Sequence, residues 1–218
     1  MEKTRRRAAP MAPEDRKAAI IDSVLPLVAE RSLDVTSREL AQAAGVAEGT
    51  LFRAFGDKTA LVGAVAVVGL GRAANPETIR ADLAAVDLSL PLERRVELVI
   101  EQGRARAVEV VRWMTMLRRM APLTGSAEDQ HERMLQYRDE FMAQQARQRA
   151  ATVEGITAVL APDLHRLRVP VEVAISLIES AVTGAHARFD HLLPAVPANV
   201  VADALVNGLA GPAEPCST

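Results

Sequence analysis

The stretch that decides the fold is VTSRELAQAAGVAEGTLFRAFGDKTAL, residues 35–61. Thr36 and Glu39 have the spacing of a capping box, in which the side chain of each residue accepts the backbone amide of the other, so a helix begins here. Gly45, which tolerates a positive φ, then turns the chain into a second short helix whose Leu51 faces inward. Two short helices joined by a glycine turn predict a helix-turn-helix.

The composition outside this stretch favours helices throughout. Only 3% of the 218 residues are aromatic, and the β-branched and aromatic enrichment typical of strands is missing, so an all-α fold is predicted. Prolines and small polar residues mark the ends of the helical segments. The predicted helices are 14–31, 37–44, 48–54, 58–70, 77–86, 91–120, 127–160, 171–193 and 198–210, and Pro26 is expected to kink the first of them.

Charge and cysteine content exclude several classes of protein. The net charge is −2, so bulk charge does not indicate a nucleic-acid partner, and residues 1–58 carry ten Lys and Arg against nine Asp and Glu. The basic N-terminus runs into proline and acidic residues, unlike a secretory signal, and no apolar stretch reaches the length of a membrane span. Cys216 can form no internal disulfide. A cytoplasmic protein without a membrane partner is expected.

Residues 14–61 resemble the TetR family of bacterial one-component transcriptional regulators. The resemblance rests on TSRELAQAAGV, on the GTLF that follows, and on the F-x-x-K-x-x-L pattern leading into the next helix. It implies a homodimer that binds a near-palindromic operator in double-stranded DNA, most often as a repressor, and that is released by a small molecule. The implied organisation is a basic arm at 1–13, a helix-turn-helix domain at 14–58, a helical effector-binding and dimerisation domain at 59–210, and a tail at 211–218.

The second helix of the motif should present its exposed face to the major groove. The resemblance implies phosphate or base contacts from the first motif helix, from the recognition helix and from the lysine that opens the next helix. Phe52 stands where the family usually has tyrosine, and Ala47 replaces the usual serine cap. The arginines of the arm could follow a minor groove, although a solvated tail is the open alternative. The predicted DNA-binding residues are Arg5, Arg6, Arg7, Ser37, Arg38, Glu48, Gly49, Thr50, Phe52, Arg53 and Lys58.

Two further features concern the larger domain. Segment 91–120 is amphipathic, with arginines such as Arg104 and Arg106 assigned to its solvent face, and a methionine-rich segment at 113–142 is able to line a cavity for a largely apolar molecule. The predicted ligand residues are Trp113, Met114, Leu117, Tyr137 and Phe141, with ordinary core packing as the alternative. Segments 171–193 and 198–210 are apolar around most of their circumference, which predicts a four-helix dimer interface, with the filling of the chain's own core as the alternative. Its predicted members are Val171, Ala174, Ile175, Ile178, Ala181, Val182, Phe189, Val201 and Leu205.

Two other functions compete with that of a regulator. An enzyme is disfavoured because Glu128 and His131 form only one of the two Glu-x-x-His pairs that a di-iron bundle needs, and no cofactor or metal site is expected. A dimeric ligand-binding protein with weakened or lost DNA binding stays open, because Glu48, Phe52 and Ala54 depart from the resemblance.

Overall fold

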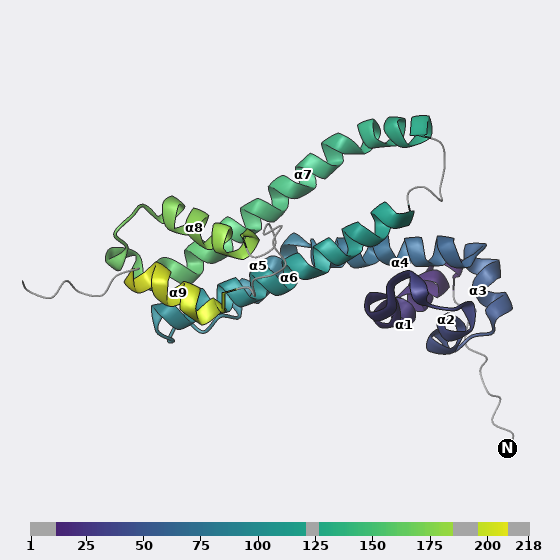
Figure 1. Ribbon diagram of the computed structural model, residues 1–218, viewed down its shortest axis with the longest axis horizontal. Coiled ribbons are helices and arrows are strands. Elements are labelled where there is room, and N and C mark those ends of the chain that lie inside the picture. The colour runs from purple at the N-terminus through teal and green to yellow at the C-terminus, as the bar shows by residue number, and fades with distance from the viewer. Residues whose placement is uncertain (1–11, 121–126, 185–195, 209–218) are drawn as a thin grey trace, which may run out of the picture. The chain divides into compact units, whose positions relative to one another are not determined.

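The computed structural model describes residues 12–120, 127–184 and 196–208, and for residues 127–141 it describes the backbone alone. The described residues form helices and contain no strand, which confirms the all-α prediction. The α-helices are α1 (Pro13–Arg31), α2 (Ser37–Ala44), α3 (Glu48–Phe55), α4 (Lys58–Ala73), α5 (Pro76–Ala84), α6 (Leu92–Met120), α7 (Ala127–Leu160), α8 (Val171–Thr183) and α9 (Ala198–Asn207), and the 3-10 helices are η1 (Ser32–Asp34) and η3 (Ala161–Arg166) (Figure 1).

The helix bounds agree closely with those expected from the sequence. α2 and α7 have the predicted ends, whereas α8 ends at Thr183, short of the predicted residue 193, and residues 185–195 lie outside the described chain. α1 continues through Pro26. The two 3-10 helices were not predicted. Ser32, at the C-terminal end of α1, has a φ of 57°, a region that favours glycine.

No single helix among the described residues is long and apolar enough to cross a membrane. The pair α3 and α4, bent by 70°, meets the length and composition requirement only when both helices are counted together.

Contacts divide the described chain into two compact units. The first contains the described residues of Met1–Gly71 and Arg112–Gly125, and the second contains those of Arg72–Val111 and Ser126–Thr218. Residues 112–120 at the end of α6 therefore belong to the first unit. The boundary expected between residues 58 and 59 separates a DNA-binding domain from an effector-binding domain. That functional division stays a prediction.

The first unit is built around the apolar faces of α1 to α4. α1 contacts both α2 and α3, and α2 contacts α3. Trp113 and Met120 on α6 complete this core: Trp113 is only 2% exposed and lies against Gly69 of α4, where an added Cβ would come within 2.4 Å of the indole ring. The buried apolar residues of the four helices are Ile20, Ile21, Val24, Val28, Leu40, Ala41, Leu51, Leu61, Val62, Val65 and Ala66.

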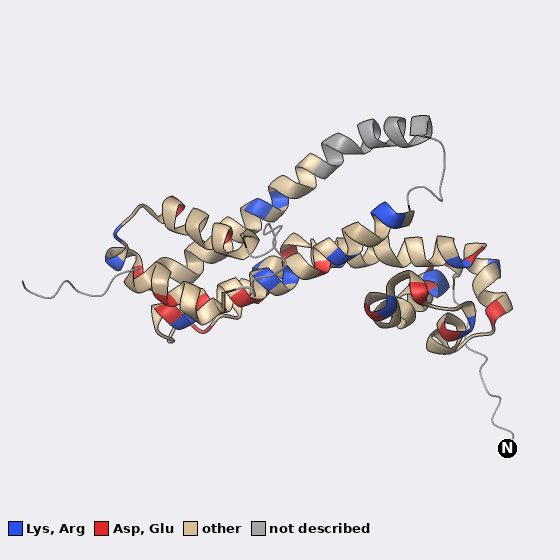
Figure 2. Ribbon diagram, in the orientation of Figure 1, with Lys and Arg blue, Asp and Glu red and all other residues tan. Residues whose placement is uncertain are grey.

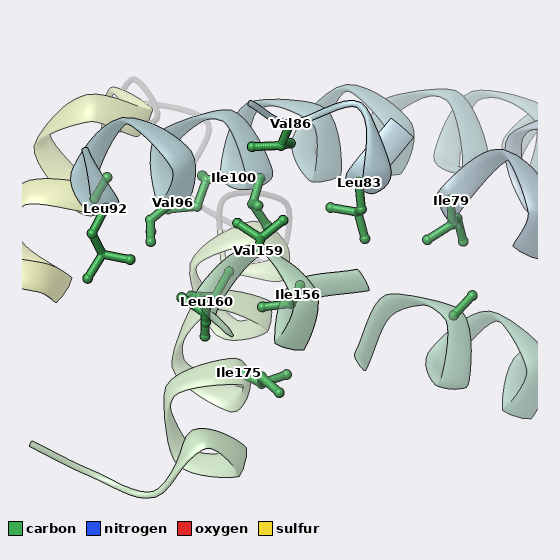
Figure 3. Packing of buried hydrophobic residues seen from close by; sticks show 14 residues of the cluster. Ile79, Leu83, Val86, Leu92, Val96, Ile100, Ile156, Val159, Leu160 and Ile175 are labelled. Atoms are coloured by element: carbon green, nitrogen blue, oxygen red, sulfur yellow. The ribbon is translucent and has the colours of Figure 1, made fainter. Parts of the chain in front are cut away.

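The second unit packs α5, α6, α7 and α8 around one apolar cluster. Side chains from all four helices meet in it, as Figure 3 shows, among them Leu83, Ile100, Ile156 and Ile175. α5 runs beside α7, and α8 contacts both α7 and α9 (Figure 1).

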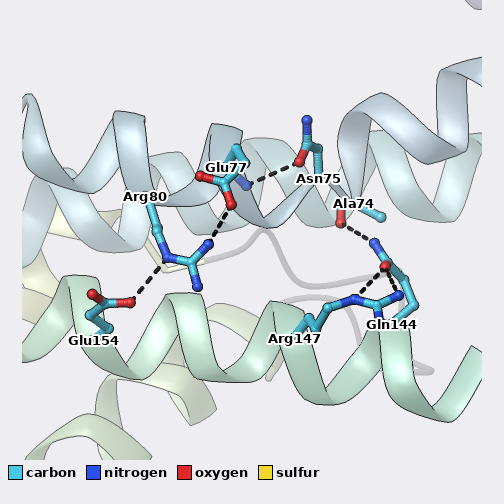
Figure 4. Close-up of polar contacts among 7 residues, drawn as sticks. All are labelled: Ala74, Asn75, Glu77, Arg80, Gln144, Arg147 and Glu154. Carbon is cyan, nitrogen blue, oxygen red and sulfur yellow. Dashed lines mark hydrogen bonds and ion pairs between the residues drawn. The ribbon is translucent and has the colours of Figure 1, made fainter.

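Polar contacts fasten α5 to α7. Arg80 of α5 donates to Glu154 of α7 at 3.0 Å, and the side-chain amide of Gln144 donates to the carbonyl of Ala74, just before α5 (Figure 4). The side-chain amide of Gln148 donates to the same carbonyl at 2.7 Å. Asn75 caps α5 by accepting the Glu77 amide at 3.0 Å.

Arg95 forms a second link, between α6 and the end of α7. Its side chain is buried and donates to the carbonyls of Leu90 and Val159 and to the carboxylate of Asp163. Asp163 also accepts from Arg166 at 2.8 Å. The bond from Arg166, with that from Arg95, holds the pKa of Asp163 below its ordinary value. The arginine therefore satisfies two backbone carbonyls and one carboxylate at a junction of three elements.

Candidate DNA-binding surface and ligand cavity

The first helix of the predicted motif begins with a complete capping box. The Thr36 hydroxyl accepts the Glu39 amide at 3.3 Å, and the Glu39 carboxylate accepts the Thr36 amide at 2.8 Å. Glu39 also pairs with Arg31 at the end of α1. The bonds from the Thr36 amide and hydroxyl, reinforced by Arg31, lower the pKa of Glu39 to about 2. The carboxylate is therefore ionised at neutral pH and joins α1 to α2.

The turn between α2 and α3 has the geometry that the glycine predicts. Gly45 has a φ of 65°, and the next amide, that of Val46, donates back to the carbonyl of Ala41 at 3.0 Å. α3 then begins at Glu48, and the residue before it, Ala47, provides no side-chain cap. The first amides of α3 consequently lack a side-chain acceptor of the usual kind, and a helix N-terminus in this state favours anions.

α3 is half buried and half exposed. Leu51 is 3% exposed and packs inward, whereas Glu48, Gly49, Phe52 and Arg53 are exposed. These four residues lie on one face because positions i, i+1, i+4 and i+5 share a helix face. Of the other predicted DNA contacts on α2 and α3, Arg38 is exposed, while Ser37 and Thr50 are half-buried. The structure thus brings the predicted contacts of α3 together on one surface.

Lys58 has a role that the sequence analysis did not predict. Its ammonium donates to the carbonyls of Val35 at 2.9 Å and Leu33 at 3.3 Å, which ties the start of α4 to the segment before α2. An ammonium has three N–H donors, so one is left for a phosphate. Asp57 accepts the Ala60 amide at 2.7 Å and caps α4.

The charge on this unit is mixed. Figure 2 shows basic and acidic residues on each of α1, α2 and α3, in agreement with the small net charge of residues 1–58. Arg5, Arg6 and Arg7 lie outside the described residues.

The second unit contains a cavity of about 1070 Å³ between α5, α6, α7 and α8. Buried apolar side chains form its floor, and Val111 and Met142, both more than half exposed, stand at its rim. The floor residues are Ile79, Leu83, Val99 and Ile156. Its polar lining includes Gln102, Arg106, Gln145, Gln148, Arg149, Thr152, Ser176, Glu179, Ser180 and Thr183.

The predicted ligand residues lie elsewhere. Trp113, Met114 and Leu117 are not among the residues that line this cavity, and the structure places them on the part of α6 that belongs to the first unit. The Trp113 side chain packs against Gly69 in the core of the first unit. Tyr137 and Phe141 lie among the residues whose side chains are not described.

Gln102 and Arg106 line the cavity although the sequence pattern did not indicate them, and Arg106 was expected on the solvent face of segment 91–120. Each of the two residues directly precedes a member of the apolar stripe, Gly103 and Ala107, so they lie at its edge. Their position at the edge of the stripe was the one signal in the sequence, because a long side chain there can turn either toward the protein interior or toward solvent.

The predicted interface residues of α8 and α9 differ in how far their own chain buries them. Ile175 and Ile178 are each 4% exposed and belong to the core of their own chain, and Val182 packs against Gly103. Val171, Ala174, Ala181 and Val201 pack partly against the same core, and Phe189 lies outside the described residues. The exposed apolar side chains are instead Val173 and Leu177 on α8, with Val200 and the predicted Leu205 on α9.

Comparison with known proteins agrees with the motif. Residues 20–65 match the model of the bacterial regulatory proteins of the tetR family. None of the curated proteins compared with the chain matches it significantly.

Solved structures resemble the chain over most of its length. A structure described as a TetR-family regulator from Mesorhizobium loti MAFF303099 is 16% identical, with 91% of this chain and 96% of that chain covered and a TM-score of 0.50. The regulator SCO0520 from Streptomyces coelicolor is 18% identical, with coverages of 88% and 97% and a TM-score of 0.48. LfrR from Mycobacterium smegmatis, solved with proflavine, is 18% identical, with coverages of 92% and 99% and a TM-score of 0.41.

A capped helix, a glycine turn and a second helix with one exposed face define a helix-turn-helix DNA-binding protein. The match of residues 20–65 gives the family of this region: it is a helix-turn-helix region of the tetR family of bacterial regulatory proteins.

Proposed function

We propose that the chain is a ligand-responsive repressor that binds a near-palindromic operator as a homodimer and is released by a small, largely apolar molecule. The observation that carries the proposal is the exposed face of α3, held by the capping box and the Gly45 turn in a chain that also contains a large cavity. The proposal includes a cytoplasmic location and no enzymatic activity.

Operator recognition is assigned to α3 and its neighbours. Arg53 and Thr50 are the candidates for base contacts, because a guanidinium and a hydroxyl at this place in a recognition helix reach base edges. Ser37, Arg38 and the remaining N–H of Lys58 are the candidates for phosphate contacts. Glu48 lies on the same exposed face and disfavours phosphate, so it supports selection among sequences more than general affinity.

The cavity of the second unit is assigned to the effector. Its volume is at the upper end of ordinary small-molecule sites, about 300–1,000 Å³. Buried apolar side chains line part of it, and ten polar residues line the rest, so it offers both apolar contact and hydrogen bonds to a ligand.

The dimer interface is assigned to the exposed apolar side chains of α8 and α9. Val173, Leu177 and Val200 are each more than 40% exposed, and the two helices that carry them, α8 and α9, are in contact. Burial of such a patch against a second copy removes apolar surface from water, and a two-fold axis places two recognition helices on one DNA site.

DNA binding by Arg53→Ala tests the proposal. Purified protein is titrated against the DNA upstream of its own gene and against random-sequence DNA of equal length. We expect Arg53→Ala to weaken binding to the upstream DNA by roughly 10- to 100-fold and to random DNA by much less, because a base contact contributes about 1–3 kcal/mol of discrimination. Arg168→Ala, which removes an exposed arginine of the second unit, is the matched control and should bind like the wild type.

The same titration distinguishes the second candidate, a dimeric ligand-binding protein without DNA binding, which Glu48 and Phe52 on the exposed face of α3 favour. Equal, weak binding of the wild-type chain to both DNAs would support that alternative.

A further inference from the structure

The wall that α8 contributes to the cavity carries a row of polar side chains. Their positions, i, i+3, i+4 and i+7, share one face of a helix, and the four residues are Ser176, Glu179, Ser180 and Thr183. The two serines and the threonine are exposed, and the Glu179 side chain is 26% exposed. These groups therefore meet the open space of the cavity, where a ligand would lie.

The hydroxyls of the lining offer mainly lone pairs to a ligand. Ser180, Thr183 and, on α7, Thr152 each donate to the carbonyl four residues earlier in the same helix, at 2.8, 2.9 and 3.0 Å. A carbonyl oxygen has no proton, so the hydroxyl is the donor in each of these bonds. Its one proton is then used, and its remaining lone pairs accept. Three of the four hydroxyls among the described lining residues are thus acceptors for a ligand.

Glu179 is the one carboxylate among the described residues that line the cavity. Its partner is Arg149 of α7, whose Nη2 lies 3.6 Å from the carboxylate. The Arg149 side chain is 73% exposed, so this ion pair stabilises little and the guanidinium is able to turn into water. Glu179 stays on the cavity wall, where a ligand that displaces water leaves the carboxylate in need of a cation.

The two arginines of the lining do not favour an anion. Arg106 is engaged by Asp82 of α5, to which its Nη2 donates at 2.6 Å. An anion would pair with Arg149 only by taking it from Glu179, and two negative charges would then lie side by side. A cation on Glu179 has the opposite effect, because it replaces Arg149 and that guanidinium regains its full hydration.

Resting on the proposal above that this cavity binds the effector, we infer that its ligand is an apolar cation, a protonated amine on a mostly apolar body. The ammonium pairs with Glu179 and donates to the hydroxyl oxygen of Thr183, one turn further along α8. A primary ammonium has three N–H donors, which suits a carboxylate with acceptors beside it. The body of the ligand fills the apolar part of the cavity over Leu83 and Ile156.

Three probes with the same apolar chain test the charge of the ligand: octylamine, 1-octanol and octanoate. Each is titrated calorimetrically into the full chain at pH 7.5, where the amine is protonated and the carboxylate is ionised. We expect octylamine to bind about tenfold more tightly than octanol, because its hydrogen bonds are charge-assisted, and octanoate to bind most weakly. Octanol or octanoate binding as tightly as octylamine, or no binding of octylamine, overturns the inference.

Glu179→Gln identifies the residue responsible. We expect this variant to bind octylamine about tenfold more weakly and octanol as before, because the amide keeps the shape of the side chain and removes its charge. Glu172→Gln removes the same charge two turns earlier on the same face of α8, outside the cavity lining, and should keep the wild-type preference. A melting curve without ligand shows that both variants fold. An unchanged preference in Glu179→Gln overturns the inference.

Arg149→Met changes the internal cation instead. We expect this variant to bind octylamine more tightly than the wild type does, because Glu179 no longer has an arginine that competes with the ligand. Weaker binding of octylamine by Arg149→Met overturns the inference.

DNA release is measured in parallel, so that the two proposals fail separately. If octylamine is preferred through Glu179 but leaves DNA binding unchanged, the inference of a cationic ligand holds and the proposed regulation by this cavity is wrong. If octanoate is preferred and releases the DNA, the proposed regulation holds and the inference of a cationic ligand is wrong.

Discussion

Among single residues, Glu39 makes the first unit sensitive to acid. Its pKa is lowered to about 2 in the folded chain from an ordinary value of 4.5, chiefly by the Thr36 amide and hydroxyl and then by Arg31. A lowered pKa means that the carboxylate stabilises the fold above its unfolded pKa, and that this contribution is lost as the pH falls from about 4.5 to about 2. We expect Glu39→Gln to be less stable than wild type at pH 7, with the difference shrinking below pH 4.5 in urea unfolding. A difference that is constant with pH would contradict the role of the charge.

Arg95 should be the most sensitive charged residue of the second unit. Its side chain is 2% exposed, and its removal leaves the carbonyls of Leu90 and Val159 without their donor and Asp163 without one of its partners. We expect Arg95→Ala to cost roughly 3–5 kcal/mol, as for a broken buried ion pair. The adjacent Arg94 is the matched control: its side chain is 48% exposed and pairs with Glu97 one turn away, so Arg94→Ala should cost less than about 0.5 kcal/mol in the same denaturation experiment.

Lys58 should affect both folding and DNA binding. We expect Lys58→Met to lower the melting temperature, because the carbonyls of Leu33 and Val35 lose their donor. We also expect it to remove about one phosphate contact, which would reduce the slope of the logarithm of the DNA-binding constant against the logarithm of the salt concentration by ~0.9. A lower melting temperature with an unchanged slope would leave Lys58 with the internal role alone.

Among the helices, those of the motif could be predicted closely and α8 only in part. The bounds of α2 follow from local chemistry, the Thr36–Glu39 capping box and the αL glycine, which needs no knowledge of the rest of the chain. α8 has apolar residues on most of its circumference, so periodicity could not determine which row its own chain buries. The structure buries Ile175 and Ile178 and leaves Val173 and Leu177 exposed.

The exposed row of α8 leads to a prediction for association. We expect Leu177→Glu to weaken the proposed dimer by at least about 100-fold in sedimentation equilibrium, because two leucines leave the interface and each contributes about 1.5–3 kcal/mol when buried. Leu164→Glu places the same charge at a leucine of η3 that is similarly exposed, at 42% against 47%, and should associate like the wild type. Unchanged association of Leu177→Glu would place the interface elsewhere.

For the chain as a whole, the position of the cavity could not be predicted from residue types. Tryptophan and methionine serve a core and a ligand site equally well, and Trp113 lies in the core of the first unit. The cavity depends on which faces of α5, α6, α7 and α8 meet, and this is a property of long-range packing. Arg106 illustrates the same difficulty, since only its pairing with Asp82 of α5 shows that it faces inward.

A substitution of Trp113 tests whether the end of α6 belongs to the core of the first unit. We expect Trp113→Ala to destabilise the first unit by about 3–5 kcal/mol, the usual cost of emptying a large buried aromatic site, in thermal unfolding followed by far-ultraviolet circular dichroism. Val108→Ala, at a 45% exposed position of α6, is the control and should change stability by less than about 0.5 kcal/mol. A small effect of Trp113→Ala would contradict its core role.

Residues 112–120 at the end of α6 belong to the first unit, and this limits how the two units can be separated and recombined. A chimera that joined residues 1–71 to a foreign sensor domain would carry the complete helix-turn-helix but would omit Trp113 and Met120, which lie against Gly69 and Gly63 of α4. Such a graft would expose an apolar face of α4 unless the foreign partner supplied side chains of similar bulk. The first unit is therefore built from two separate segments of the sequence. A chimera that keeps its core must contain both of them.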